Sequence, residues 1–86
     1  MNFAERFGAN LRAAREGKGI SQEDLGFRSG LHRTAVGQIE RGERVARTDT
    51  LVQLSGALAL EPQHLLAGLS WSPASYRSGG MQVEEG

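Results

Sequence analysis

The sequence predicts an all-α protein in which five short helices share one small core. Apolar residues recur at helical spacing in several segments, and glycines and capping residues separate these segments at short intervals. The chain has 86 residues, of which 38% are hydrophobic and 6% aromatic, which suits one compact domain and excludes a large enzyme with a deep pocket. We expect the helices to occupy residues 1–69 and residues 70–86 to form a flexible C-terminal tail.

The first helix is indicated by apolar residues that fall on one helical face, namely Phe3, Phe7, Leu11 and Ala14. It should end at residues 17–19, because glycine readily takes the left-handed conformation that closes helices. Ser21 predicts the start of a second helix over about 22–29, since its hydroxyl can accept a hydrogen bond from the first turn. Asp24 stands three residues later, in the position that completes a capping box.

The second and third predicted helices are short and close together. The second helix should bury Leu25 and part of Phe27. The third should cover about 32–41, with Val36 and Ile39 turned inward. Two short helices joined by about three residues that include a glycine form the helix-turn-helix unit of DNA-binding domains.

A fourth helix is predicted after a polar loop, with Thr48 or Asp49 as its cap. Its apolar positions repeat at helical spacing and are Leu51, Leu54 and Leu58. Pro62 should open a fifth short helix, because proline is well placed in a first turn, and Gly68 should end it.

The predicted tail is rich in serine, glycine and proline and has no helical period, which is typical of a flexible segment. Met81 and Val83 alternate with polar residues, so a short strand that docks on a partner stays open as an alternative.

Catalytic and metal chemistry has little support in the sequence. Cysteine is absent, and His32 and His64 lie on different predicted helices. We therefore predict no catalytic residue, no metal site and no cofactor, and hence no enzyme. The apolar runs are far too short for a membrane span, and the N-terminus lacks the continuous apolar stretch of a signal peptide. We expect a cytoplasmic protein that does not enter a membrane.

Basic residues gather in one segment although the formal net charge is zero. Residues 28–47 hold five arginines against two glutamates, so this stretch can face an anionic surface. A solvated helix face that carries arginine is the alternative interpretation.

Residues 5–68 resemble the phage repressor and Cro-type helix-turn-helix regulators of the XRE family. The strings that carry the resemblance are LRAAR at 11–15, ISQEDL at 20–25, SGL at 29–31, IERG at 39–42, and the leucines of 51–60 and 65–66. The run from His32 to Arg44 is also similar to controller proteins of restriction–modification systems. The resemblance implies a lambda-repressor-like fold and a homodimeric regulator that binds double-stranded operator DNA, with repression favoured over activation.

The resemblance also implies that the helix at about 32–41 enters the major groove and reads bases with Arg33, Thr34 and Gln38. Arginine can pair with guanine and glutamine with adenine, while threonine can bond either kind of base edge. Phosphate contacts are expected from Ser21, Gln22, Arg41, Arg44 and Arg47. His32 is a poor cap for this helix, and we expect it to have a neutral surface role. The alternative interpretation is that these residues form an exposed polar surface that binds no ligand.

In similar repressors an arginine of the first helix pairs with the glutamate that ends the reading helix. Arg15 and Glu40 occupy these positions, so the resemblance implies a structural ion pair that fixes the angle between two helices.

One reading helix covers only a few base pairs, which is why a twofold dimer is expected. We predict a dimer interface made by the last helix and the residues just after it: His64, Leu65, Leu66, Leu69 and Trp71. For Trp71, packing onto the core of its own domain is the alternative. A protein-interaction or antitoxin-like module that acts through the last helix and the tail is the competing function.

Overall fold

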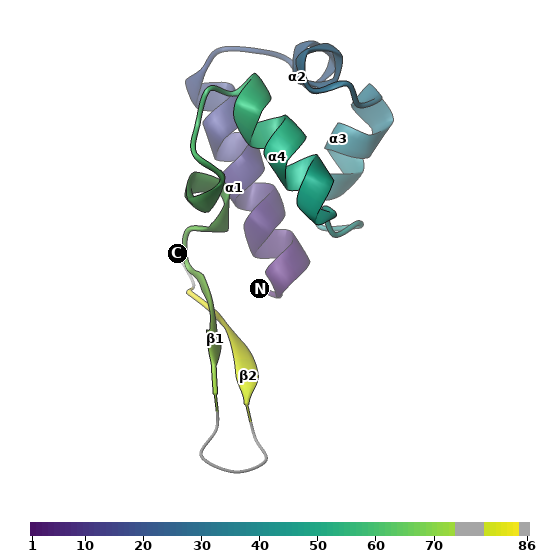
Figure 1. Cartoon of the computed structure of the whole chain (residues 1–86). Coiled ribbons are helices and arrows are strands. Elements are labelled where there is room, and N and C mark those ends of the chain that lie inside the picture. The colour runs from purple at the N-terminus through teal and green to yellow at the C-terminus, as the bar shows by residue number, and fades with distance from the viewer. Residues whose placement is uncertain (74–78, 85–86) are drawn as a thin grey trace.

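The computed structural model describes residues 1–73 and 79–84, which form a helical domain followed by a small β-hairpin (Figure 1). The elements are α1 (Phe3–Gly17), α2 (Gln22–Ser29), α3 (Arg33–Glu40), α4 (Thr48–Ala57), a 3-10 helix η1 (Pro62–Leu66), β1 (Leu69–Ser72) and β2 (Gly80–Val83). The first four helices thus lie where the apolar spacing and the punctuating glycines predict them.

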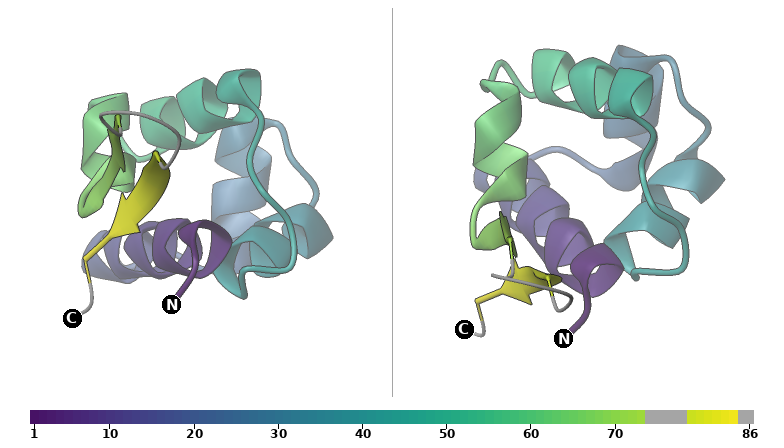
Figure 2. Two further views of the ribbon diagram at one scale, coloured as in Figure 1. Left: turned by 90° about the horizontal axis from the view of Figure 1, so that it is seen from below. Right: turned by 60° about the horizontal axis from the view of Figure 1, so that its bottom comes forward.

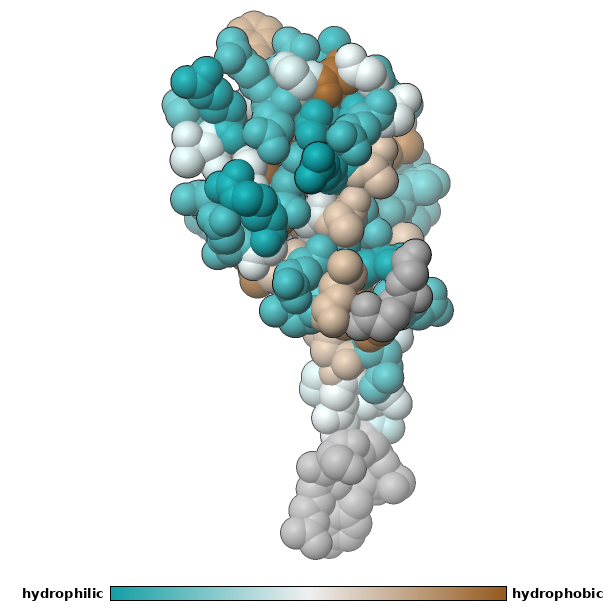
Figure 3. All heavy atoms as spheres, turned by 180° about the vertical axis from the view of Figure 1, so that it is seen from behind, coloured by the Kyte–Doolittle hydropathy of each residue, from teal (hydrophilic) through white to brown (hydrophobic). Residues whose placement is uncertain are grey.

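The helices form a closed ring around the core, as both views of Figure 2 show. Each element contacts the next in the order α1, α3, α2, α4, η1 and back to α1. The core in the centre consists of Phe7, Leu11, Leu25, Val36, Ile39, Leu54, Leu58 and Leu65. Seen from behind, the helical domain is covered mainly by hydrophilic residues, which is consistent with one interior core (Figure 3).

The fold is not all-α, and the prediction of five helices is corrected in two ways. The fifth helix is a five-residue 3-10 helix rather than an α-helix. Strands β1 and β2 then pair antiparallel, with Leu69 opposite Val83 and Trp71 opposite Met81. The expectation that the tail lacks regular structure is therefore wrong for the two strands. The alternation at Met81 and Val83 does indicate a strand, but its partner is β1 of the same chain.

The hairpin projects away from the helices on the side where the N-terminus lies (Figure 1). Its base contacts α1, and Leu69 packs against the edge of the core.

The caps at the helix starts show which local predictions hold. Ser21 caps α2 as predicted, since its Oγ accepts a bond of 3.0 Å from the N–H of Asp24 in a complete capping box. His32 was expected to cap poorly, yet its Nδ1 accepts a bond of 3.0 Å from the N–H of Thr34 at the start of α3. The predicted cap of α4 is wrong, because Arg47 holds the cap position and no side chain bonds there.

Phe27 is not buried, contrary to expectation, and its side chain is 89% exposed. It lies two residues after Leu25, which is about 200° around a helix, so burial of one directs the other outward.

Replacing Phe27 by serine is therefore expected to change the free energy of unfolding by no more than about 0.5 kcal/mol, because little apolar area leaves the interior. Urea denaturation measures this change. The matched control is Leu25→Ser, at a position with 0% exposure, which should destabilise the domain strongly. A large loss at Phe27 would contradict the exposed position.

Within the part of the chain that the structure describes, no helix is long and apolar enough to cross a membrane.

Candidate nucleic-acid interface

A tight turn joins α2 to α3 and fixes the angle between them. Gly30 ends α2 in the left-handed conformation, with a φ of 77°, and the N–H of Leu31 donates a 2.8 Å bond to the carbonyl of Gly26. A Cβ on Gly26 would lie 2.7 Å from the carbonyl oxygen of Leu31, so the turn packs directly on the α2 backbone. These contacts hold α3 in one orientation.

Helix α3 has a buried side and an outward side. Val36 and Ile39 point into the core, as predicted. Arg33 and Thr34 are exposed at the N-terminal end of the helix, and Gln38 is half-buried. Two of the three predicted base-reading residues are thus freely presented, and the third is partly covered.

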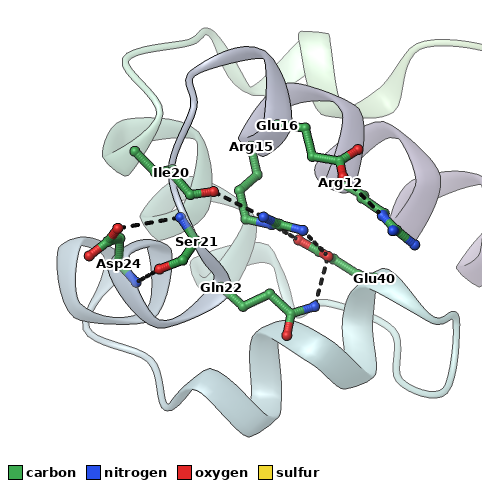
Figure 4. A network of polar contacts seen from close by, with 8 residues as sticks. All are labelled: Arg12, Arg15, Glu16, Ile20, Ser21, Gln22, Asp24 and Glu40. Carbon is green, nitrogen blue, oxygen red and sulfur yellow. Dashed lines mark hydrogen bonds and ion pairs between the residues drawn. The ribbon is translucent and has the colours of Figure 1, made fainter.

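A buried polar network connects α1, α2 and α3 (Figure 4). The guanidinium of Arg15 donates to both carboxylate oxygens of Glu40, at 2.6 and 3.1 Å, and to the carbonyl of Ile20 at 2.9 Å. The side chain of Gln22 donates to Glu40 at 3.0 Å. The side chains of Arg15 and Glu40 are only 12% and 2% exposed, so this is the interhelical ion pair that the family resemblance implied.

The hydrogen bond to Glu40 raises the pKa of Arg15 above its usual value, because it stabilises the charged guanidinium. The network therefore holds an ionised pair between α1 and the end of α3.

Gly37 has no side chain, and the side chain of Arg41 occupies the space beside it on α3. A Cβ at Gly37 would lie 3.0 Å from Nη1 of Arg41 and 3.5 Å from Oε1 of Gln22. Arg41 thus folds back along α3 toward Gln22, a position that the sequence did not reveal. The glycine could have indicated it, since only a residue without a side chain leaves this space.

Three of the predicted DNA-contacting arginines carry a carboxylate partner on the surface. Arg33 pairs with Glu23 at 3.1 Å, Arg41 with Glu43 at 2.7 Å, and Arg47 with Asp49 at 3.3 Å. The hydrogen bond from Arg41 lowers the pKa of Glu43, and the same bond raises the pKa of Arg41. Within residues 1–73 and 79–84, Arg44 is exposed and forms no ion pair. Sequence reasoning missed these partners.

The predicted dimer residues lie on η1 and β1, and η1 packs mainly against α1 and α4, away from α2 and α3 (Figure 2). Leu65 is 0% exposed and belongs to the core of its own chain, so including it in a dimer interface was wrong. His64 is exposed, and Leu66 and Leu69 are half-buried. Trp71 is 62% exposed on β1, which rules out the alternative that it packs into the core of its own domain.

This geometry, a short helix held by a glycine turn with a second helix presented outward, defines a helix-turn-helix domain. Residues 11–65 match the family model described as helix-turn-helix. The chain belongs to this helix-turn-helix family of DNA-binding transcriptional regulators.

Similar proteins include controllers of restriction–modification systems. Control protein C.BamHI of Bacillus amyloliquefaciens is 43% identical over 66 residues, which cover 76% of this chain and 82% of that protein. The crystal structure of controller protein C.AhdI from Aeromonas hydrophila is 45% identical with a TM-score of 0.71, covering 72% of this chain and 94% of that one. The P22 c2 repressor in complex with a synthetic operator is 37% identical with a TM-score of 0.67, over 72% and 94% of the two chains.

Proposed function

We propose that this chain regulates transcription by binding an operator as a homodimer, with α3 of each copy in the major groove. The observation that carries the proposal is the outward placement of Arg33 and Thr34 at the N-terminal end of α3, the end that reaches base edges in helix-turn-helix complexes. The similarity to controller proteins and to an operator-bound repressor supports the same conclusion.

In this complex Arg33 binds a guanine, and Thr34 and Gln38 contact neighbouring base edges. Gln38 is half-buried, so less of its side chain is accessible to a base than for Arg33 and Thr34. The phosphate contacts come from Ser21 and Gln22 at the start of α2, where backbone N–H groups favour anions, and from Arg41, Arg44 and Arg47. The side-chain Nε2 of Gln22 donates one hydrogen bond to Glu40, so its backbone N–H and the second N–H of Nε2 are the donors available for a phosphate.

The dimer contact lies on η1 and β1, through His64, Leu66, Leu69 and Trp71. The large exposed area of Trp71 supports this assignment, because aromatic residues carry much of the energy of protein interfaces. Two α3 helices one helical turn of DNA apart then recognise a palindromic site.

Replacing Arg33 by alanine tests the reading role. Selection of binding sites from a random duplex library by the unaltered protein gives the operator and its half-site spacing. Arg33→Ala should weaken binding to that operator by about 1–3 kcal/mol and relax the preference at one base pair in each half-site. Titration of the labelled operator and of duplexes substituted at single base pairs measures both effects.

The matched control is Arg12→Ala, which removes the same charge from an exposed ion pair on α1. It should leave the base preference unchanged. If the unaltered protein selects no sequence, or if Arg33→Ala keeps the full base preference, the proposed reading role is wrong.

A further inference from the structure

Carboxylates beside the proposed DNA-binding arginines are an unusual feature for a surface that meets an anionic polymer. Each of the pairs at Arg33, Arg41 and Arg47 lies on exposed side chains. Exposed ion pairs contribute little to stability. Any larger effect of these carboxylates is thus on DNA binding, and among the three pairs the one of Glu23 with Arg33 joins α2 to α3.

The pair of Glu23 and Arg33 is created by the turn rather than by chain proximity. Glu23 is in the first turn of α2 and Arg33 is the first residue of α3, ten positions later. Oε2 of Glu23 accepts a bond of 3.1 Å from Nη1 of Arg33, and the two side chains are 74% and 66% exposed. The other two arginines pair with acids only two residues away along the chain.

The bond to Glu23 occupies only part of the Arg33 guanidinium. A guanidinium has five N–H donors, and Nη1 alone is engaged here. The remaining donors are enough for the two bonds that an arginine forms with O6 and N7 of guanine. Arg33 can thus keep its bond to Glu23 while it reads a base.

A phosphate is a different partner for the same arginine. Guanine offers uncharged acceptors, whereas a phosphate brings a full negative charge next to the Glu23 carboxylate and is repelled by it. From this asymmetry we infer that Glu23 determines specificity: it positions Arg33 for a base edge and disfavours its use on the DNA backbone. The inference rests on the proposed function, since it requires Arg33 to face DNA.

The experiment compares Glu23→Gln with Glu16→Gln. Both variants remove one negative charge, and Glu16 is in an exposed pair with Arg12 on α1, at 3.5 Å. The probes are the duplex selected by the unaltered protein and a scrambled duplex of the same length and composition. Dissociation constants are measured for both duplexes at two salt concentrations, and thermal unfolding is followed in parallel.

Glu23→Gln should strengthen binding to the scrambled duplex and lower the ratio of specific to non-specific affinity by about five- to tenfold. The salt dependence of scrambled binding should also steepen, because Arg33 becomes free to contact a phosphate. Glu16→Gln should shift both affinities together and leave the ratio near its original value.

Equal affinity ratios for the two variants would overturn the inference. A lower melting temperature of Glu23→Gln with an unchanged ratio would overturn it too, since it would leave Glu23 with only the helix-stabilising role of an acid in a first turn. If the unaltered protein selects no sequence at all, the proposed function fails first. The unaltered protein can also select an operator to which Arg33→Ala binds more weakly, while Glu23→Gln keeps the original ratio of specific to non-specific affinity. In that case only the inference about Glu23 fails.

Discussion

Replacing Glu40 by alanine is expected to lower the free energy of unfolding by about 3–5 kcal/mol, the largest loss we predict for a polar residue of this domain. The change removes a carboxylate that is 2% exposed and leaves the guanidinium of Arg15 between α1 and α3 without its charge partner. Gln22 loses its acceptor at the same time. Urea denaturation followed by circular dichroism measures the loss.

Glu43→Ala is the matched control, because Glu43 also bonds an arginine but is 54% exposed. It should change stability by less than about 1 kcal/mol. The double variant Arg15→Met with Glu40→Met should recover much of the loss, since an apolar pair leaves no buried charge. A loss at Glu40 as small as that at Glu43 would contradict the structural role of the ion pair.

Replacing Gly8 by alanine should destabilise the domain by roughly 3 kcal/mol or more, although alanine favours helices. Gly8 lies where α1 passes over the end of α3, and a Cβ there would meet the carbonyl oxygens of Ile39 and Glu40, the second at 2.5 Å. Backbone atoms cannot turn aside as a side chain can, so the two helices must separate. Thermal and urea unfolding measure the loss.

Gly56→Ala is the control for helix propensity. Gly56 is inside α4, and a Cβ there would meet nothing within 4 Å. This variant should stabilise the protein by about 0.5–1 kcal/mol. If the two alanine variants behave alike, the close approach of α1 to α3 is wrong.

The helices could be predicted because their signals are local. Apolar spacing indicates α1, and the hydroxyl of Ser21 with Asp24 indicates the start of α2. The helix type of η1 could not be predicted from local signals, because a five-residue segment offers too little periodicity to distinguish a 3-10 helix from an α-helix. The hairpin was missed because β1 and β2 are stabilised by pairing with each other, which neither short segment reveals alone.

The candidate site could be predicted in outline and not in its contacts. The outward face of α3 follows from the inward positions of Val36 and Ile39. The partners of the arginines depend on rotamers and, for Glu23, on the angle of the turn, so spacing along the chain gives no reliable signal. Leu65 was misassigned because a leucine in a short terminal helix looks the same whether it faces a partner or its own core.

The buried Arg15–Glu40–Gln22 network has a consequence for how this protein can evolve. The Arg15, Glu40 and Gln22 contacts that help to set the orientation of α3 lie inside the domain. Arg33 and Thr34 are exposed instead, and Arg33 pairs with an exposed carboxylate, that of Glu23. Under the proposed reading role, exchanges at these two exposed positions would change the preferred DNA sequence at little cost in the free energy of folding. New binding preferences could then be explored one substitution at a time on an unchanged scaffold.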